Sequence, residues 1–332
     1  MAEAVVEPFR PAGADEGDLA DYYRVLVDAQ GVDRPDEPIP GYGTVVGRLD
    51  SPFPGLGPAT HWVARVGGRV VAFGNAHFPE AENGHIAVVD VVVHPSRRRG
   101  GIGTALLAVI GAEARARGRR LLEGWQVVQG GSGERWAAAS GFRPVRSIAI
   151  QALEVAEVDH ARWRVAAPAG YRVVRWTGAA PEELVASYAA ARSAINDAPV
   201  GESGFRQPEW TVARVREHEA GLREQGIEQR TVVAVEVATG DVVGLTELVV
   251  PPHRPDWGYQ QDTAVLVGHR GHGLGLAIKA CLVRHLVAER PGITRVQTAT
   301  GSDNAHMIRV NHLLGFRTVR TLIAMSREVR GG

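Results

Sequence analysis

Two short glycine-rich turns carry the clearest chemical signal in this sequence of 332 residues. The first is Arg-Arg-Gly-Gly-Ile-Gly at residues 98–103, and the second is Arg-Gly-His-Gly-Leu-Gly at residues 270–275. Glycines allow the backbone to take positive φ and to approach a ligand closely. Unpaired N–H groups and the dipole at a helix start attract anions. Because an amphipathic stretch follows each turn, we interpret both turns as pyrophosphate sites, to which Arg98 and Arg270 add positive charge.

Three known kinds of glycine-rich, phosphate-binding turn can be compared with these two turns. A P-loop closes with Gly-Lys-Ser/Thr, which neither turn contains. A dinucleotide-binding fingerprint needs a third glycine, and Leu106 and Leu276 stand where that glycine would fall. The pyrophosphate loop of an acyl-CoA site is the third kind, and it is compatible with both turns.

The two turns belong to a duplication that spans most of the chain. Asp90 precedes Arg98 by eight residues, and Asp262 precedes Arg270 by the same distance. Further on, Gly-Phe-Arg-Pro-Val-Arg-Ser at 141–147 matches Gly-Phe-Arg-Thr-Val-Arg-Thr at 315–321, so two blocks recur in order, displaced by 172 to 174 residues. A period of this length indicates two homologous domains rather than a repeat array.

The duplication and the composition between its halves predict the domain boundaries. We expect an N-terminal domain at residues 1–156, a linker at 157–169 and a C-terminal domain at 170–332. The linker contains charged residues and then Ala-Ala-Pro-Ala-Gly at 166–170, a composition typical of connecting segments.

Hydrophobic patterns predict the same mixture of helices and strands in both halves. In the C-terminal half we expect a strand at 171–176, helices at 181–194 and 210–225, strands at 231–237, 242–250 and 261–267, a helix from 274 to the Pro-Gly at 291–292, a strand at 293–299, a helix at 304–314 and closing strands at 316–329. In the N-terminal half we expect strands at 5–10, 62–66, 70–78, 86–93, 120–128 and 148–155, a helix at 102–117 and a long surface loop at 31–57. The predicted fold class is therefore α/β, an α+β unit with a mixed sheet, used twice.

These motifs resemble the signature of the GNAT acetyltransferase superfamily. The resemblance rests on Val265 through Gly275, on Asn304, and on the Leu-Leu-Gly-Phe at 313–316. The N-terminal half resembles a second copy through Val-His-Pro at 93–95, its glycine turn and Ser-Gly-Phe at 140–142. The resemblance implies two tandem acyl-CoA N-acyltransferase domains that use acetyl-CoA as co-substrate.

The resemblance also assigns residues to the acetyl-CoA site. The strand end at Val265, Leu266 and Val267 would offer backbone groups to the pantetheine arm and the acetyl carbonyl, and Asn304 would contact the pantetheine or shape its channel. The pyrophosphate would lie on Arg270, Gly271, His272, Gly273, Leu274 and Gly275. The corresponding residues of the N-terminal half are Val93, Arg98, Gly101 and Gly103.

One position departs from the family pattern. Many members have a tyrosine that protonates the leaving thiolate where this chain has Asn311, and an amide cannot act as an acid. The N-terminal half departs further, because Ala137 and Gly130 stand at the positions of Asn311 and Asn304. We therefore expect the C-terminal domain to be catalytic, with Asn311 at the leaving-group position and water or another side chain as the acid.

Transfer of an acetyl group to an amine needs a base that removes a proton from the ammonium. Glu247 lies among Leu245 and Leu248 on a predicted strand, where burial would raise its pKa and suit it to that role. An ordinary outward-facing strand residue fits the pattern equally well. Asp262 is a second candidate, ranked below Glu247 because its recurrence as Asp90 favours a shared structural role.

Other polar residues are weaker candidates for the acceptor site. Tyr259 and His253 precede the strand of Asp262, and Asp197 lies in an Asn-Asp-Ala-Pro turn between the first two helices of the C-terminal half. Each fits a solvated loop or turn at least as well as an amine-binding site.

Composition excludes several classes of protein. Lys+Arg and Asp+Glu are both 37, so the chain lacks the charge of a typical nucleic-acid binder, and no apolar run is long enough for a membrane span. Cys281 is the single cysteine, which rules out an intrachain disulfide and a cysteine-based zinc site. We expect a cytoplasmic monomer or homodimer with no metal, no nucleic acid and no membrane partner.

Two functions remain open from the sequence. The first is an acetyl-CoA-dependent N-acetyltransferase that acts on a small-molecule amine by direct attack. The alternative, suggested by Asn311 and by the degenerate N-terminal half, is a non-catalytic protein that binds or senses acyl-CoA.

Overall fold

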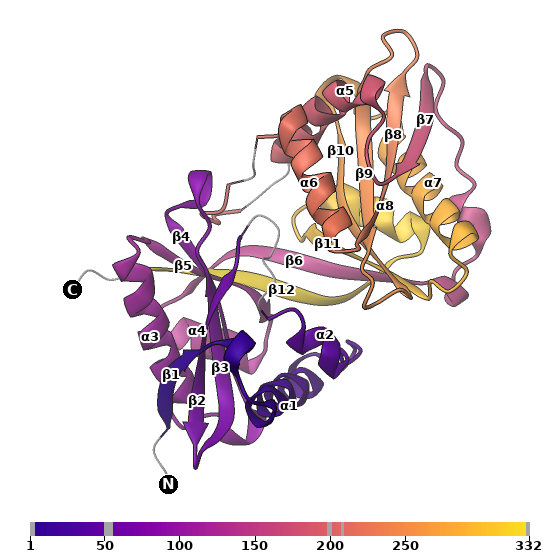
Figure 1. Cartoon of the computed structure of the whole chain (residues 1–332). Coiled ribbons are helices and arrows are strands. Elements are labelled where there is room, and N and C mark those ends of the chain that lie inside the picture. The colour runs from indigo at the N-terminus through magenta and orange to yellow at the C-terminus, as the bar shows by residue number, and fades with distance from the viewer. Residues whose placement is uncertain (1–3, 50–55, 198–200, 207–208, 330–332) are drawn as a thin grey trace. The chain divides into compact units, whose positions relative to one another are not determined.

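The computed structural model describes residues 4–49, 56–197, 201–206 and 209–329. The chain forms two compact units. Unit 1 comprises residues 1–147, 201–206 and 322–332, and unit 2 comprises residues 148–200 and 207–321. Both are mixed α/β units, as the sequence predicts (Figure 1).

Unit 1 is built on a six-stranded mixed sheet in the order β1-β2-β3-β4-β5-β12. Its strands are β1 (Val5–Phe9), β2 (Ala59–Val66), β3 (Arg69–His77), β4 (Ile86–Val93), β5 (Leu121–Val128) and the second half of β12 (Arg317–Glu328). Strands β4 and β5 are parallel, whereas the pairs β1–β2, β2–β3, β3–β4 and β5–β12 are antiparallel. The strands expected in the N-terminal half up to residue 128 are confirmed to within a few residues.

Helices cover both faces of the unit 1 sheet (Figure 1). The long helix α1 (Glu16–Asp33) packs Tyr22 and Val25 against Phe73 on one face. On the other face α3 (Ile102–Ala116) and α4 (Ser132–Ala139) share a core with Trp62 and Ala72. The expected surface loop at 31–57 is wrong in part, because α1 extends into it and α2 (Tyr42–Val46) forms within it; residues 50–55 lie outside the described part of the chain.

Unit 2 repeats this architecture with the strand order β7-β8-β9-β10-β11-β6. Its strands are β7 (Tyr171–Thr177), β8 (Glu228–Glu236), β9 (Val242–Val250), β10 (Trp257–Val265), β11 (Arg295–Gly301) and the second half of β6 (Arg143–Glu154). Strand β10 begins four residues before the predicted start at Gln261. This added stretch packs closely at Gly258, because a Cβ there would lie 3.0 Å from Leu248 Cδ1 and 3.1 Å from Leu286 Cδ2.

Alternate residues of the unit 2 strands face two helical layers. Val233 and Val235 share one core with α5 (Glu182–Arg192) and α6 (Val212–Glu224). Val232 and Ala234 share the other core with α7 (Leu274–Glu289) and α8 (Ala305–Leu314). The helices expected in this half are therefore confirmed, and Cys281 is buried in the α7 core as a small apolar residue.

The units do not follow the boundary between the repeats, because each takes its last strand from the other repeat. Residues 148–154 of β6 pair antiparallel with β11 of unit 2. Residues 322–328 of β12 pair antiparallel with β5 of unit 1. The expected domains 1–156 and 170–332 therefore describe the sequence repeat but not the packed units.

The expected linker at 157–169 is also partly packed. A short 3₁₀ helix at His160–Trp163 places the Trp163 side chain in the unit 2 core with 1 % of its surface exposed. Its indole N–H donates to the Leu314 carbonyl at 3.0 Å. Most other residues of this stretch are exposed, including four of the five in the Ala-Ala-Pro-Ala-Gly sequence at 166–170, as expected of a connector.

Candidate functional site

Each glycine turn positions a helix start in the same way. Gly101 caps α3 at φ 81°, and Gly273 caps α7 at φ 78°, in the left-handed region that favours glycine. Neither helix receives a side-chain hydrogen bond at its N-cap, so the first backbone N–H groups remain available for an anion. A Cβ added at Gly271, Gly273 or Gly275 would meet no atom within 4 Å, which leaves open space in front of the second turn.

The arginine of each glycine turn hydrogen-bonds to the end of the preceding strand. Arg98 Nε donates to the Val93 carbonyl at 3.1 Å, and Arg270 Nε donates to the Val265 carbonyl at 2.9 Å. In unit 1 the rest of the Arg98 guanidinium makes a two-pronged ion pair with Asp33, with N–O distances of 2.9 and 2.6 Å. The positive charge expected from Arg98 at its turn is therefore balanced by a carboxylate of α1.

The two parallel strands of each unit separate just before the turn. In unit 2 the β10–β11 pairing ends at Gln260 and Thr298, although β10 continues to Val265. The Leu266 N–H donates to Val243 of β9, and because backbone groups alternate along a strand, the Val265 N–H points to the β11 side. The wedge between these strands thus offers a backbone donor at the residue where the sequence predicts contact with the acetyl group.

The two helix starts differ at their second glycine, Gly103 in unit 1 and Gly275 in unit 2. A Cβ on Gly103 would lie 3.4 Å from the Trp136 ring of α4, and Arg98 also donates to Ser132 Oγ at 3.2 Å. These contacts close α4 onto the start of α3. The corresponding Gly275 has no neighbour within 4 Å of an added Cβ, so unit 2 has the roomier groove.

Asn304, expected at the pantetheine, and Asn311, expected at the leaving-group position, have different surroundings. Asn304 caps α8 by accepting from the Met307 N–H at 3.0 Å, and its Nδ2 makes no hydrogen bond with the described residues. Asn311 is fully buried, and its Nδ2 donates to Gln151 Oε1 at 2.7 Å and to Thr300 Oγ1 at 3.2 Å. Asn311 therefore links α8 to β6 and β11, and its role in the described structure is to hold these elements together.

Glu247 lies at the centre of a buried polar cluster on the α5 side of unit 2. Its side chain is 1 % exposed, which excludes an outward-facing strand position. The Tyr188 hydroxyl donates to one carboxylate oxygen, and Arg192 Nη2 donates to the other at 3.0 Å. Trp210 stacks on the Arg192 guanidinium at 3.4 Å from ring centroid to Cζ.

Burial dominates the electrostatics of this cluster. It raises the pKa of Glu247, and the nearby Asp262 carboxylate raises it as well, while Arg192 opposes the rise. It also lowers the pKa of His218, which packs on Trp210, to about 4. A carboxylate whose pKa is raised is a stronger base than an ordinary glutamate.

Asp262 occupies a bulge directly across from Glu247. The β9–β10 register shifts between Gln260 and Thr263, so Gln261 and Asp262 bulge at the position that faces Glu247. Asp262 is partly exposed. The structure therefore brings the two candidate carboxylates together, one buried and one in contact with solvent.

The same framework in unit 1 lacks the glutamate. The His94 N–H donates to Val71 as Leu266 does to Val243, so Asn75, four residues after Val71, corresponds to Glu247. Asn75 pairs with Asp90 and interacts with the Tyr22 hydroxyl of α1. Leu26, four residues after Tyr22, stands where α5 has Arg192. Unit 1 thus keeps the tyrosine and the aspartate, and it replaces the carboxylate and its arginine.

The sequence did not identify Tyr188, Arg192 and Trp210. Alignment of the two first helices on their tyrosines would have suggested Tyr188, because Tyr22 and Tyr188 occupy equivalent places. The other candidate residues have other neighbours. Tyr259 packs on Trp257, and His269 Nδ1 lies 3.0 Å from the Tyr171 hydroxyl oxygen. The side chain of Asp197 lies outside the described residues.

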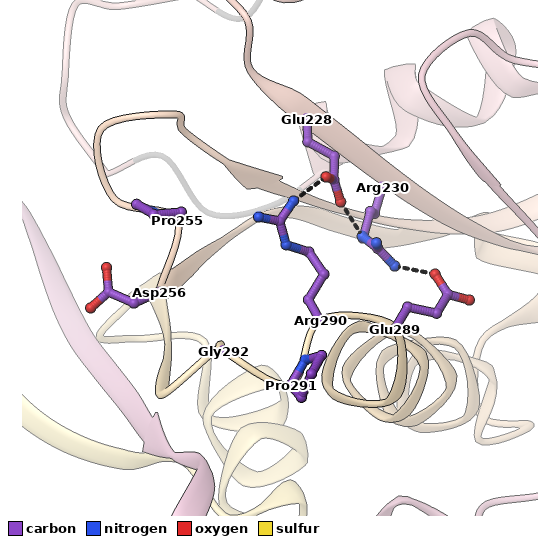
Figure 2. A pocket seen from close by; sticks show the side chains of 8 residues that line it. All are labelled: Glu228, Arg230, Pro255, Asp256, Glu289, Arg290, Pro291 and Gly292. Carbon is purple, nitrogen blue, oxygen red and sulfur yellow. Dashed lines mark hydrogen bonds and ion pairs between the residues drawn. The ribbon is translucent and has the colours of Figure 1, made fainter.

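A surface hollow among the described residues lies elsewhere in unit 2. It has a volume of about 580 Å³ and lies between the start of β8, the turn before β10 and the end of α7 (Figure 2). Figure 2 shows Glu228 bridging Arg290 and Arg230, while Arg230 also bonds Glu289. Because these charges neutralise one another and lie at the far end of α7 from the glycine turn, the hollow is not part of the candidate site.

The described residues show neither a metal-binding cluster nor a helix that could span a membrane. They contain no group of three or more His, Cys, Asp or Glu side chains arranged to hold a metal ion. No helix among them is both long and apolar enough to cross a bilayer.

Comparison with known proteins gives consistent matches. The model of the acetyltransferase (GNAT) family matches residues 34–130 and 199–316. A mycothiol acetyltransferase from Saccharomonospora viridis is 29 % identical over 295 residues, which are 86 % of each chain. Both repeats are therefore represented in these matches.

Solved structures match the whole chain. A tandem GNAT protein from the clavulanic acid biosynthesis pathway is 27 % identical with a TM-score of 0.79, covering 99 % of this chain and 100 % of its own. A GCN5-related N-acetyltransferase from Sphaerobacter thermophilus has a TM-score of 0.75 at 18 % identity, covering 99 % and 96 %; this second match shows the fold alone.

Proposed function

The chain belongs to the acetyltransferase (GNAT) family, and from this premise we propose that it is an acetyl-CoA-dependent N-acetyltransferase in which unit 2 acetylates the amine of a small molecule. Members of the family use acetyl-CoA as co-substrate.

The buried Glu247 cluster carries the proposal. Unit 2 combines a raised carboxylate pKa, an open helix start and a separated strand pair. Unit 1 has Asn75 in place of the glutamate and Trp136 against its helix start. Since both halves share one fold, these differences favour unit 2 as the catalytic unit.

In this proposal the chain supplies three functions for direct attack by an amine. Glu247 accepts the ammonium proton, and Asp262 on the bulge connects that buried carboxylate to solvent. The Val265 N–H polarises the acetyl carbonyl as negative charge develops on its oxygen. The start of α7, with Gly271, Gly273 and Gly275, holds the pyrophosphate.

The leaving thiolate receives its proton from water in this account. Asn311 cannot donate a proton as an acid, and its amide is already bonded to Gln151 and Thr300. A coenzyme A thiol has a pKa close to that of a free cysteine, so its thiolate needs little help to leave at neutral pH.

The acceptor is proposed to be a small molecule because the matched relative is named for one, mycothiol. The proposal is tested by thiol release from acetyl-CoA in the presence of a panel of amines that includes a polyamine, an amino sugar and an amino acid. We expect turnover with at least one amine, and a loss of about 10² to 10⁴ in kcat for Glu247→Gln, with unchanged acetyl-CoA affinity.

A matched variant in unit 1 controls for effects on folding. Asn75→Ala removes the corresponding side chain, and we expect it to leave kcat within a factor of about two. Acetyl-CoA binding without turnover on any amine would instead support the alternative of a non-catalytic acyl-CoA sensor.

A further inference from the structure

Polar side chains gather at the bulge of unit 2 that faces Glu247. Strand β10 places two residues, Gln261 and Asp262, opposite the single residue Glu247 of β9. A bulge of this kind locally disrupts the ladder of backbone hydrogen bonds between two strands. In unit 2 the side chains that border the bulge provide additional bonds between β9 and β10.

Gln260 and Thr263 border the bulge on β10, and both bind the Thr246 hydroxyl of β9. Gln260 Nε2 donates to Thr246 Oγ1 at 2.8 Å, and the hydroxyl oxygens of Thr246 and Thr263 lie 2.7 Å apart. Gln260 Nε2 also donates to the backbone carbonyl of Glu247 at 2.6 Å. We call Gln260, Thr246 and Thr263 the bulge clamp, because they join both ends of the bulge to β9.

Burial gives the bulge clamp a defined geometry. Gln260 and Thr246 are both buried, so water cannot replace a hydrogen bond that they lose. A backbone carbonyl oxygen can only accept a hydrogen bond, so the amide of Gln260 must present Nε2 to the Glu247 carbonyl. The clamp therefore holds the bulge in one arrangement.

The clamp and the carboxylate of Glu247 lie on opposite faces of the sheet. Thr246 and Glu247 are neighbours on β9, so their side chains point in opposite directions. The Glu247 carboxylate meets Tyr188 and Arg192 of α5, whereas Gln260 binds Thr246 on the other face. The hydrogen bond from Gln260 to Glu247 is made to its backbone, so Gln260 acts on the position of this residue.

Unit 1 has neither the bulge nor the clamp in its described strands. The β3–β4 pairing between residues 72–77 and 88–93 has no register shift, and Asn75 pairs directly with Asp90. The corresponding places hold residues without a hydrogen-bonding side chain, namely Gly74, Val88, Val89 and Val91. The bulge and its polar border therefore occur together, in the unit that also has the glutamate.

Charge couples the bulge to the proposed base. Burial is the largest cause of the raised pKa of Glu247, and the negative charge of Asp262 adds to it. The other two ionisable groups that act on Glu247, Tyr188 and Arg192, lower that pKa from α5. Electrostatic interaction weakens with distance. Movement of Asp262 away from Glu247 would therefore lower the pKa of Glu247.

We propose that Gln260 is a positioning residue for acetyl transfer in unit 2: through the bulge clamp it holds Asp262 beside Glu247, so that the buried base keeps its connection to solvent. This inference rests on the proposed function of unit 2. It gives the bulge a task that the regular strand pairing of unit 1 does not perform.

The first test follows the carboxyl groups in the full-length protein. Gln260→Met keeps the length of the side chain and removes both hydrogen bonds that Gln260 donates. Asp262 is then no longer held, so we expect the pKa of Glu247, followed by carboxyl ¹³C NMR, to fall below its wild-type value. In Asp262→Asn this pKa should already be lower, and addition of Gln260→Met should not change it further.

Turnover is the second readout. With an amine that the wild-type protein accepts, we expect Gln260→Met to lower kcat about tenfold, because the base and its connection to solvent are misplaced. The KM for acetyl-CoA should stay unchanged, and the acid limb of kcat/KM should move to lower pH. If Gln260→Met fails to fold, Thr263→Val removes one hydroxyl of the clamp and should cause smaller changes in the same directions.

Gln30 of unit 1 supplies a matched control. It is also a buried glutamine, and its Nε2 also donates twice, to the carbonyls of Glu37 and Pro38. Gln30→Met removes the same two kinds of hydrogen bond and should lower the stability of the protein. It should change neither kcat nor the titration of Glu247.

The outcomes separate this inference from the proposed function. If the wild-type protein turns over no amine, the proposed function fails and the role of Gln260 in acetyl transfer falls with it. If the wild type turns over an amine while Gln260→Met leaves the pKa of Glu247 and the acid limb unchanged, only the inference is overturned. A shift that persists in the Asp262→Asn background, or that Gln30→Met reproduces, overturns it as well.

Discussion

At the scale of single residues, the site is defined by a carboxylate that differs between two copies of one fold. Glu247 was visible in the sequence as a charged residue among leucines, but the sequence could not decide which way it faces. Its partners Tyr188 and Arg192 lie about 55 to 59 positions away on a helix, and no local pattern connects such distant residues.

The raised pKa of Glu247 predicts a shift in the pH dependence of turnover. The base works when deprotonated, so kcat/KM should fall on the acid side at a pH above the usual range of a glutamate. The Tyr188 hydroxyl lowers the pKa of Glu247 by donating to it. Tyr188→Phe should therefore move the acid limb to higher pH.

The control for this pH profile is available in unit 1. Tyr22 is as buried as Tyr188, with 2 % and 1 % exposed, and it sits on the corresponding helix. Tyr22→Phe should leave the limb in place. An acid limb that does not move in Tyr188→Phe would show that Glu247 is not the group that titrates.

Lys279, the single lysine of the chain, predicts a stability effect. It is 1 % exposed in α7 beside the Phe316 ring, and burial lowers its pKa from 10.5 to about 7. The unfolded chain then binds one more proton than the folded protein between about pH 7 and 10.5, so stability rises with pH across this window. Below pH 7 the buried ammonium imposes its full cost.

Lys279→Met removes this cost and should stabilise the protein at pH 6 by on the order of 3 to 5 kcal/mol, since each pKa unit is worth about 1.4 kcal/mol. Denaturant unfolding at pH 6 and pH 10 checks the prediction, and the gain should shrink at the higher pH. Lys279→Arg, which keeps a charge at every pH, should show no gain; an equal gain for Met at both pH values would contradict the explanation.

At the scale of elements, the sequence predicted the existence of nearly all strands and helices of the C-terminal half. It could not predict which sheet edge a strand joins. The stretches at 148–155 and 316–329 have a clear strand pattern, but alternation specifies only which face of a strand is buried. The exchange of β6 and β12 is decided by tertiary pairing, and Asn311 contributes by bonding α8 to Gln151 of the exchanged strand.

The exchange predicts that the chain can be cut between the repeats without separating them. A protease site inserted in the exposed Ala-Ala-Pro-Ala at 166–169 would cut the connector. Because residues 148–154 pair with β11 and residues 322–328 pair with β5, the two pieces should elute together at the position of the intact 35.5 kDa chain. They should separate only in denaturant, and separation in plain buffer would contradict the exchange.

At the scale of the whole molecule, the two units share one fold, and the proposed function gives them different tasks. Both keep the glycine turn, the arginine bond to the strand end and the tyrosine of the first helix. Only unit 2 has the glutamate with its arginine and an open helix start. The positions at which the two copies differ are scattered along the sequence, so the proposed division of labour between the units depends on residues that only the fold brings together.

The most direct test of this division places the same obstruction in each glycine turn. Gly273 and Gly101 cap equivalent helices at φ 78° and 81°, and a Cβ at either meets no atom within 4 Å, so substitution strains both backbones alike. Thiol release from acetyl-CoA with the accepted amine is measured for Gly273→Glu and Gly101→Glu. If unit 2 is the catalytic unit, Gly273→Glu abolishes turnover and Gly101→Glu retains most of the wild-type turnover. Loss of turnover in Gly101→Glu alone would contradict this assignment.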